Sequence, residues 1–423
     1  MKNRLAANGD VGAPSVGAGT VAAAPAPDET GAVPAGSTSP STGFDPAELQ
    51  SALDGIHRAG MPGIYAEVRD SGQVWRGASG VADVDTGRPV TPDMRHRVGS
   101  VTKTFTAAAI LQQVEEGRIE LDAPIGHYLR RLVPGERGES ITVRMLLNNT
   151  SGIPDYLPSA FPSFRGFPSL SDVSPESLDD NRFRTFHPTE LIEMGLTAPP
   201  VGEPGSPTGT YSNTNYLLLG QLLQQVTGAP AEEYITRKII EPAGLHHTEF
   251  PTGPHIEGPH SRMYESLFGL IDPPRDYSVY DASWVSTGAA LVSTMEDLND
   301  FYGQLLNGEI VNHSSLTQMQ RTVPVRALDG TMINYGLGLH KVTFPGCGTF
   351  WGHDGTVWGA STLSLTSADG KRQMSLAMNL ARWNKIDSSG KPQHHPIDDA
   401  LSTLYRRAVC GDGTHQAEPG QPT

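Results

Sequence analysis

The chain of 423 residues has little cysteine, little charge and no long apolar run. Its two cysteines, Cys347 and Cys410, are too few for a multi-disulfide scaffold or a zinc site built from thiolates alone. They could form one bridge or remain two buried thiols. Charged residues make up 18% of the chain, below the roughly 25% of typical globular proteins. No run of about 18 apolar residues occurs, which excludes a membrane-spanning helix.

Basic residues are also scarce relative to acidic ones. There are 31 Lys and Arg against 46 Asp and Glu, a formal net charge of −15 with neutral histidine. Nucleic acids and anionic membranes bind clustered basic side chains, so neither is an expected partner.

Several catalytic and nucleotide-binding motifs are absent. The lack of Gly-x-Ser-x-Gly disfavours an α/β-hydrolase. The chain has neither His-Glu-x-x-His nor the phosphate-binding Gly-x-x-x-x-Gly-Lys-Ser/Thr motif. The histidine doublets His246-His247 and His394-His395 lack a third ligand at a suitable spacing, so we expect them at the surface and predict no metal site.

Glycine (47) and proline (34) are abundant, and they are dense at both ends. Residues 1–43 are almost all small or polar, and such a segment buries too little apolar surface to fold. Its Lys2, Arg4 and an alanine-rich run form only a weak export signal, because Gly and Pro interrupt the apolar region. We therefore predict a disordered segment over 1–43, a folded domain over 44–410 and a flexible tail over 411–423.

Hydrophobic spacing within 44–410 predicts a mixed α/β fold with strands and a helix at each end and helices between. The sheet part is expected over about 44–90 and 330–410, and the helical part over about 120–300. The predicted strands are Ile64–Arg69, Gln73–Gly80, Gly336–Val342, Thr349–Gly352, Ser361–Thr366 and Arg372–Asn379. The predicted helices are Asp45–His57, Val101–Glu116, Pro188–Gly195, Asn215–Thr227, Glu232–Ile240, Met295–Asn307 and Pro396–Val409, and Pro158–His187 is predicted to be irregular.

Ser-x-x-Lys occurs twice, beginning at Ser100 and at Ser388. Only the first copy opens an apolar helix, where residues three apart share a face and free backbone N–H groups favour negative charge. There a buried Lys103 with a lowered pKa could activate Ser100. The alternative is a helix N-cap at Ser100 and a solvated Lys103, and the motif alone favours that alternative.

Two further short motifs could complete a site. Tyr211-Ser212-Asn213 precedes a predicted helix, and it offers a phenol to relay protons and an amide to orient a substrate. His353-Asp354-Gly355 lies in a glycine-rich stretch after a predicted strand, where a substrate could approach the backbone. The structural alternatives are a buried tyrosine with a turn asparagine, and a tight turn.

These three motifs, in this order, resemble the serine β-lactamase and penicillin-binding-protein family. More closely, the chain is similar to the secreted Streptomyces-type D-alanyl-D-alanine carboxypeptidases and their class C β-lactamase and esterase relatives. The similar stretches are Arg97–Phe105, Leu146–Ile153, Tyr211–Tyr216, Tyr335–Leu339 and Gly352–Val357.

The resemblance implies a fold and a set of roles. It implies a five-stranded antiparallel sheet with terminal helices beside an all-helical region, and no metal or cofactor. It also implies a Cys347–Cys410 disulfide and hence a secreted protein. The implied roles are Ser100 as nucleophile, Lys103 with Tyr211 as acid/base group, Asn213 for the substrate amide, His353 in the proton network, Gly355 as space for the acyl chain, and the Ser100 and Thr356 N–H groups as oxyanion hole.

Two residues depart from the carboxypeptidase pattern and bear on the substrate. His340 stands where those relatives have an Arg that holds the substrate carboxylate, and a neutral imidazole offers no charged fork. Asp354 replaces a Thr, and its negative charge would repel a carboxylate. Both changes are compatible with an ester, an amide or a substrate that carries an amine.

The sequence therefore predicts a serine acyl hydrolase. The first hypothesis is a D-alanyl-D-alanine carboxypeptidase that acts on peptidoglycan stem peptides and could be acylated by β-lactams. The alternatives are an esterase, a D-amino-acid amidase or aminopeptidase, a β-lactamase and a peptide cyclase of the penicillin-binding-protein type. A non-catalytic penicillin-binding sensor is the alternative from another class. The expected partner is a small peptide, ester or β-lactam, and the expected state is a monomer.

Overall fold

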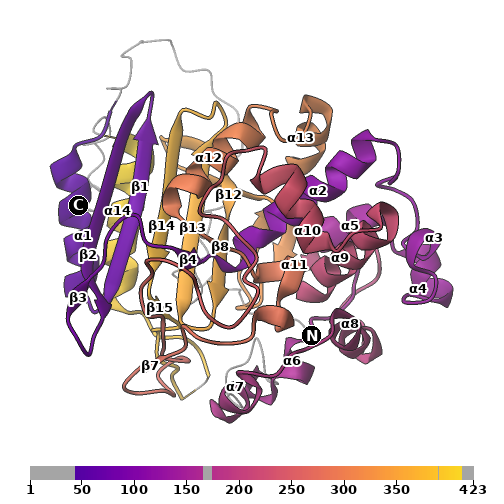
Figure 1. Ribbon diagram of the computed structural model, residues 1–423, viewed down its shortest axis with the longest axis horizontal. Coiled ribbons are helices and arrows are strands. Elements are labelled where there is room, and N and C mark those ends of the chain that lie inside the picture. The colour runs from indigo at the N-terminus through magenta and orange to yellow at the C-terminus, as the bar shows by residue number, and fades with distance from the viewer. Residues whose placement is uncertain (1–42, 165–173, 389, 412–423) are drawn as a thin grey trace, which may run out of the picture.

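The computed structural model describes residues 43–164, 174–388 and 390–411 (Figure 1). The expected disordered segment, apart from residue 43, and the tail beyond residue 411 lie outside the described residues. Among the helices described, none is both long and apolar enough to cross a membrane.

Five long antiparallel strands form the centre of the sheet, in the order β2 (Gln73–Asp83), β1 (Gly63–Asp70), β14 (Arg372–Met378), β13 (Ala360–Ser367) and β12 (Gly348–Val357). Strands from the two ends of the chain are thus neighbours, as β1 pairs with β14. The β1–β2 hairpin closes at Ser71 and Gly72, both at positive φ, as two-residue hairpin turns require. This arrangement confirms the predicted mixed α/β class.

The sheet is wider than the five strands expected. Short strands β11 (His340–Phe344), β10 (Met332–Tyr335), β9 (Val323–Arg326) and β5 (Gly209–Thr210) extend it beyond β12, and β3 (Arg88–Pro89) extends it beyond β2. The β5–β9 pair is parallel, so the described sheet of ten strands is not wholly antiparallel.

Two strand predictions near the third motif had the wrong bounds. The predicted strand Gly336–Val342 is a turn over Gly336–Leu339 followed by β11, and Gly338 (φ +71°) supplies the left-handed conformation of that turn. The predicted strand Thr349–Gly352 continues as β12 through His353-Asp354-Gly355 to Val357. Glycine is rare in strands, but a Cβ on Gly352 would lie 1.8 Å from the Ser364 carbonyl oxygen, so close backbone approach explains the glycine.

The terminal helices α1 (Pro46–Arg58) and α14 (Pro396–Cys410) cover one face of the sheet (Figure 1). Their apolar stripes, with Leu49, Leu53 and Leu401, pack against sheet residues such as Leu376 in one core. The predicted disulfide is present and joins Cys347, in the β11–β12 turn, to Cys410 at the end of α14.

The other face of the sheet carries α12 (Met295–Leu306) and the helical region. Helix α2 (Thr102–Glu115) is buried nearly all round and packs against α9 (Asn213–Thr227) and α11 (Ser286–Ala289), so it is the central helix of that region. Helices α3 (Gly126–Leu129), α5 (Val143–Leu147) and α8 (Pro188–Thr197) pack against α9, and α4 (Gly135–Ser140) packs against α3. Helix α10 (Ala231–Ile235) contacts both α2 and α9 and continues as a π-helical turn over Thr236–Ile240.

The remaining elements are short. In the segment predicted to be irregular, the described residues include α6 (Leu157–Ala160) and α7 (Glu176–Asn181). The others are α13 (His313–Met319), β4 (His96–Arg97) paired with β8 (Val292–Ser293), and β15 (Leu380–Ala381) with β6 (Tyr264–Glu265) and β7 (Arg275–Asp276). The bounds of the predicted helices differ from those of the observed helices by at most two residues at each end, with α10 and its π-helical turn taken together.

Candidate active site

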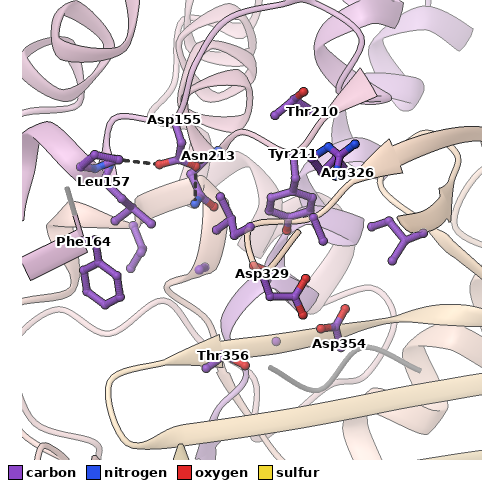
Figure 2. A pocket seen from close by; sticks show the side chains of 18 of the residues that line it. Asp155, Leu157, Phe164, Thr210, Tyr211, Asn213, Arg326, Asp329, Asp354 and Thr356 are labelled. Atoms are coloured by element: carbon purple, nitrogen blue, oxygen red, sulfur yellow. Dashed lines mark hydrogen bonds between the residues drawn. The ribbon is translucent and has the colours of Figure 1, made fainter. Parts of the chain in front are cut away.

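A cavity of about 280 Å³ lies between the helical region and the edge of β12 (Figure 2). Ser100, Tyr211 and Asn213 line it from the helical side, and Asp354 and Thr356 line it from β12. The three sequence motifs, which are more than a hundred residues apart along the chain, therefore meet at one cavity.

Ser100 lies in a 3-10 turn, Gly99–Val101, that runs directly into α2. The N-cap positions of the turn and of α2 are Val98 and Val101, so Ser100 is not the N-cap that the alternative required. The turn depends on Gly99, whose φ of +55° is a conformation that few other residues adopt. The hydroxyl of Ser100 is thus left available to side chains in the cavity.

Lys103, one helical turn further on, is fully buried, which removes the alternative of a solvated helix face. Its Nζ donates hydrogen bonds to Ser100 Oγ (3.0 Å), Asn213 Oδ1 (2.6 Å) and the Gly288 carbonyl oxygen (3.0 Å). Burial lowers the pKa of Lys103 to about 7, against the smaller opposing effect of nearby carboxyl groups. A lysine with that pKa can accept a proton near neutral pH.

Tyr211 lies next to the same pair of residues. Its ring centroid is 4.9 Å from Lys103 Nζ, and Tyr211 and Ser100 line the same cavity. Burial raises the pKa of Tyr211 well above its ordinary value, so the phenol keeps its proton at neutral pH. Of the two groups, Lys103 is therefore the one poised to change protonation state.

Asp155 is a site residue that the sequence reasoning missed. One of its carboxylate oxygens accepts hydrogen bonds from the backbone N–H (2.7 Å) and Nδ2 (2.8 Å) of Asn213, as Figure 2 shows. These bonds fix the amide so that its Oδ1 faces Lys103. The available clue was its position two residues after the family-like stretch Leu146–Ile153, but nothing distinguishes it locally from a loop aspartate.

His353 lies on β12 next to Asp354, which lines the cavity, and it is almost completely buried. Its Nε2 is 3.1 Å from the Tyr335 hydroxyl, and its Nδ1 is 2.5 Å from the Asp354 carbonyl oxygen. Its ring is 6.4 Å from that of Tyr211, centroid to centroid. The structure thus places His353 next to the site, where it contacts Tyr335. The role of His353 in proton transfer stays a prediction.

His340 and Asp354 form a close pair on neighbouring strands. His340 Nδ1 is 3.2 Å from Asp354 Oδ1, while His340 Nε2 is buried without a hydrogen-bond partner. Burial lowers the pKa of His340 to about 3, so this imidazole is neutral. Burial, with the nearby Asp329, raises the pKa of Asp354 to about 7. Among the described residues, His340, His353 and Asp354 are close enough together to share a metal ion.

Two glycines bring the backbone of β12 against the Ser100 turn. A Cβ added to Gly355 would lie 2.8 Å from the Ser100 nitrogen, and one added to Gly99 would lie 2.7 Å from the Thr356 nitrogen. The amides predicted to form the oxyanion hole therefore belong to adjoining backbone segments that both line the cavity.

An aromatic wall, which the sequence reasoning also missed, closes one side of the cavity. Trp358 stacks on Trp284 with centroids 4.6 Å apart and on Phe164 at 5.3 Å. The Arg382 guanidinium lies 5.2 Å from the centroid of the Trp358 ring and is paired with the buried Glu265. These side chains offer a substrate an apolar surface beside the polar groups.

The histidine doublets lie away from this cavity. His246, His247 and His394 are exposed, and His394 pairs with Asp399 at 3.1 Å. His395 is half-buried and caps the N-terminus of α14.

Comparison with known proteins gives relatives among serine hydrolases and penicillin-binding proteins. A crystal structure of a D-stereospecific amidohydrolase from Streptomyces sp. is 33% identical, with a TM-score of 0.72 over 86% of this chain and 99% of that one. Penicillin-binding protein 4* of Bacillus subtilis is 25% identical over 70% of this chain and 63% of its own length. Protein flp of Staphylococcus aureus is 28% identical over 52% of this chain, and the match spans less than half of its length (43%).

The family model described as Beta-lactamase matches residues 49–396, which include all three motifs and the cavity. The predicted resemblance is confirmed: this chain belongs to the β-lactamase family, a family of serine hydrolases that includes penicillin-binding proteins.

Proposed function

We propose that this protein is a serine amidohydrolase or esterase that transfers the acyl group of a D-amino-acid derivative with a free amine to Ser100 and then to water. The observation that carries the proposal is the 3.0 Å hydrogen bond between Ser100 Oγ and a buried Lys103 whose pKa is about 7. A serine becomes a nucleophile when an adjacent base can take its proton.

In the proposed acylation, neutral Lys103 accepts the Ser100 proton as Oγ attacks the substrate carbonyl carbon. The N–H groups of Ser100 and Thr356 stabilise the resulting oxyanion. When the bond to the leaving group breaks, that group takes the proton back through Lys103 and Tyr211. In deacylation the same groups take a proton from water as it attacks the acyl carbon, and they return it to Ser100 Oγ when the ester bond breaks, which releases the acid and restores the serine.

Charge in the cavity supports a substrate amine over a substrate carboxylate. Asp354 lines the cavity, and its ionised carboxylate would repel an incoming anion. Its neighbour His340 is neutral and offers no positive charge. A free amine could instead pair with Asp354. The aromatic wall of Phe164, Trp284 and Trp358 suits a large apolar side chain on the same substrate. The similarity to an enzyme described as a D-stereospecific amidohydrolase supports the D configuration.

A D-alanyl-D-alanine carboxypeptidase is the second candidate. Arg326 on β9 lines the same cavity and is exposed, so a cationic group is available on the side opposite β12 (Figure 2). A substrate carboxylate would have to pair with Arg326, since His340 offers no charge.

We further propose that the protein works outside the cytoplasm. The Cys347–Cys410 bridge supports this location, because disulfides persist in oxidising compartments. Free-thiol titration of the protein recovered from its native host tests it, and two reactive thiols would contradict it.

Activity-based labelling tests the nucleophile. Intact-mass spectrometry after treatment with a fluorophosphonate is expected to show one adduct on the wild type and none on Ser100→Ala. Ser388→Ala is a matched control, because it removes the serine of the exposed second Ser-x-x-Lys copy. Labelling that survives Ser100→Ala contradicts the assignment, and a chain that binds substrates without any adduct is the non-catalytic sensor.

Substrate assays then separate the two candidates. We expect hydrolysis of D-phenylalanine amide, with the L-amide and the N-acetylated D-amide at least about tenfold poorer, since each loses one specific contact. Faster release of D-alanine from an N-acylated D-Ala-D-Ala peptide would instead establish the carboxypeptidase. Incubation with a penicillin in the same assay tells whether β-lactams label Ser100.

A further inference from the structure

Two imidazoles and one carboxylate converge at the cavity, where His340 on β11 lies beside His353 and Asp354 on β12. The two imidazole centroids are 4.0 Å apart. Asp354 Oδ1 is 3.2 Å from His340 Nδ1 and 3.7 Å from His353 Nδ1. One carboxylate oxygen thus faces both Nδ1 atoms.

Those separations match the edges of a metal coordination polyhedron. With Zn–N and Zn–O bonds of about 2.0–2.2 Å, two ligand atoms of a tetrahedral site lie about 3.3–3.5 Å apart. The observed 3.2 and 3.7 Å bracket this range, and all three ligand atoms lie within 4.8 Å of one another. The imidazole planes are 35° apart, so the rings must rotate for both Nδ1 atoms to point at one ion.

We propose that His340, His353 and Asp354 form a site for Zn²⁺ or a similar divalent transition-metal ion, which the expectation of a metal-free chain did not include. Imidazole nitrogen and carboxylate oxygen are ligands that this class of ion prefers. Three protein ligands leave a coordination position for water or a substrate atom, and the position faces the cavity because His340 and Asp354 line it.

The surroundings support ligation by His353. In the metal-free protein its Nδ1 contacts the Asp354 carbonyl oxygen, and metal binding replaces that contact. The imidazole proton then resides on Nε2, which can donate it to the Tyr335 hydroxyl at 3.1 Å. A hydrogen bond of this kind orients a metal-bound histidine and fixes its tautomer. His340 would bind through Nδ1, which exchanges its 3.2 Å contact with Asp354 Oδ1 for the bond to the metal, and its proton would move to Nε2.

Occupation of this site would change the chemistry of the cavity. The ion would neutralise Asp354, which we propose to pair with the substrate amine, and would place positive charge near Lys103. We therefore infer that the metal inhibits turnover of amine-bearing substrates reversibly. The proposed metal site does not depend on the proposed function. The proposed inhibition does rest on the proposed function.

Cobalt spectroscopy tests the binding. Titration of the full chain with Co²⁺ is expected to give the strong visible d–d bands of four- or five-coordinate cobalt, and Zn²⁺ is expected to displace them. Asp354→Asn and His340→Gln are each expected to weaken affinity at least about tenfold, the loss that even an outer-shell change can cause. Thermal melts of each variant verify folding, and the use of two variants guards against misfolding of one.

Two control variants make the outcome specific. His394→Gln removes a histidine from an exposed His–Asp pair and is expected to leave Co²⁺ affinity unchanged. Ser100→Ala is expected to keep the cobalt bands, which separates failure of the metal site from failure of the nucleophile assignment. Absence of the bands, or their persistence in both Asp354→Asn and His340→Gln, overturns the proposal.

The functional consequence has its own measurement. Micromolar Zn²⁺ is expected to slow hydrolysis of D-phenylalanine amide, and EDTA is expected to restore it. The inhibition is expected to vanish in His340→Gln but not in His394→Gln. If Zn²⁺ binds to the three residues and the rate is unchanged, the inhibitory role is wrong.

Discussion

Lys103 donates a 3.0 Å hydrogen bond to the Ser100 hydroxyl from a position that is closed to solvent. A buried ammonium is costly, and here its charge is balanced by hydrogen bonds rather than by a direct ion pair with a carboxylate. The neutral amine is correspondingly favoured, which makes this lysine the base of the pair.

The first prediction concerns pH. Because burial lowers the pKa of Lys103 to about 7, its neutral form is scarce at pH 6 and dominant above pH 8. The rate of fluorophosphonate labelling of Ser100 is expected to rise about tenfold per pH unit below 7 and to level off above it. Labelling rates from pH 5 to 10 check this, and a rise that continues to pH 10 would show that Lys103 has an ordinary pKa.

A second prediction separates the tyrosine ring from its hydroxyl. Tyr211→Phe keeps the ring beside Lys103 but removes the hydroxyl that we propose relays protons, so we expect kcat/KM to fall about 10²–10⁴-fold with little change in stability. Tyr405→Phe is the matched control, since its hydroxyl is buried on the other face of the sheet without a partner. Near-normal kcat/KM in Tyr211→Phe would assign proton transfer to Lys103 alone.

Sequence patterns correctly predicted those helices and strands in which the local conformational preference of the residues agrees with their packing in the fold. Helix α14 has an apolar stripe and lies within a residue of its predicted bounds, because one face packs on the sheet and the other meets water. Strand β12 was cut short in the prediction, since Gly352 and Gly355 are poor strand formers and are explained only by backbones that approach from elsewhere.

The same limit applies to the site. Short motifs contain four of the site residues, namely Ser100, Lys103, Tyr211 and Asn213. The structure brings these four together, as the family resemblance implies. Asp155 belongs to no motif, and its importance arises from hydrogen bonds to a residue 58 positions away. Such long-range contacts leave no periodicity in a single sequence.

A third prediction tests Asp155 as a positioning residue. One carboxylate oxygen of Asp155 accepts both bonds from Asn213, and the other accepts the Leu157 backbone N–H. In Asp155→Asn one of these oxygens becomes an NH₂ group, so in either orientation of the new amide one set of donors loses its acceptor and the hold on Asn213 weakens. We expect the protein to lose about 1–3 kcal/mol of stability and kcat to fall more than KM rises. Steady-state kinetics and urea unfolding measure this, with the exposed Asp122→Asn as control. An unchanged kcat would limit Asp155 to a structural role.

A fourth prediction concerns the contact between β12 and the Ser100 turn. In Gly355→Ala the new methyl group would lie 2.0 Å from the Val98 carbonyl oxygen, so the two backbones must separate. Overpacking of this kind costs about 1–3 kcal/mol, and the separation would also move the Ser100 and Thr356 amides apart. We expect a loss of labelling together with a lower unfolding midpoint. Gly253→Ala is the control because a Cβ there meets nothing within 4 Å, and full activity in Gly355→Ala would argue against an oxyanion hole at this contact.

The last prediction concerns the Cys347–Cys410 bridge, which closes a loop with a sequence separation of 63. On the chain-entropy model this cross-link stabilises the folded state by about 4 kcal/mol. We expect the free energy of unfolding of the double variant Cys347→Ser/Cys410→Ser to be lower by that amount, so that it unfolds at a lower urea concentration. Its kcat is expected to stay normal at 25 °C, because the bridge lies at the far end of β12 from Thr356. Dithiothreitol is expected to destabilise the wild type to the same extent and to leave the double variant unchanged. If dithiothreitol shifts both proteins equally, its effect does not arise from this bridge.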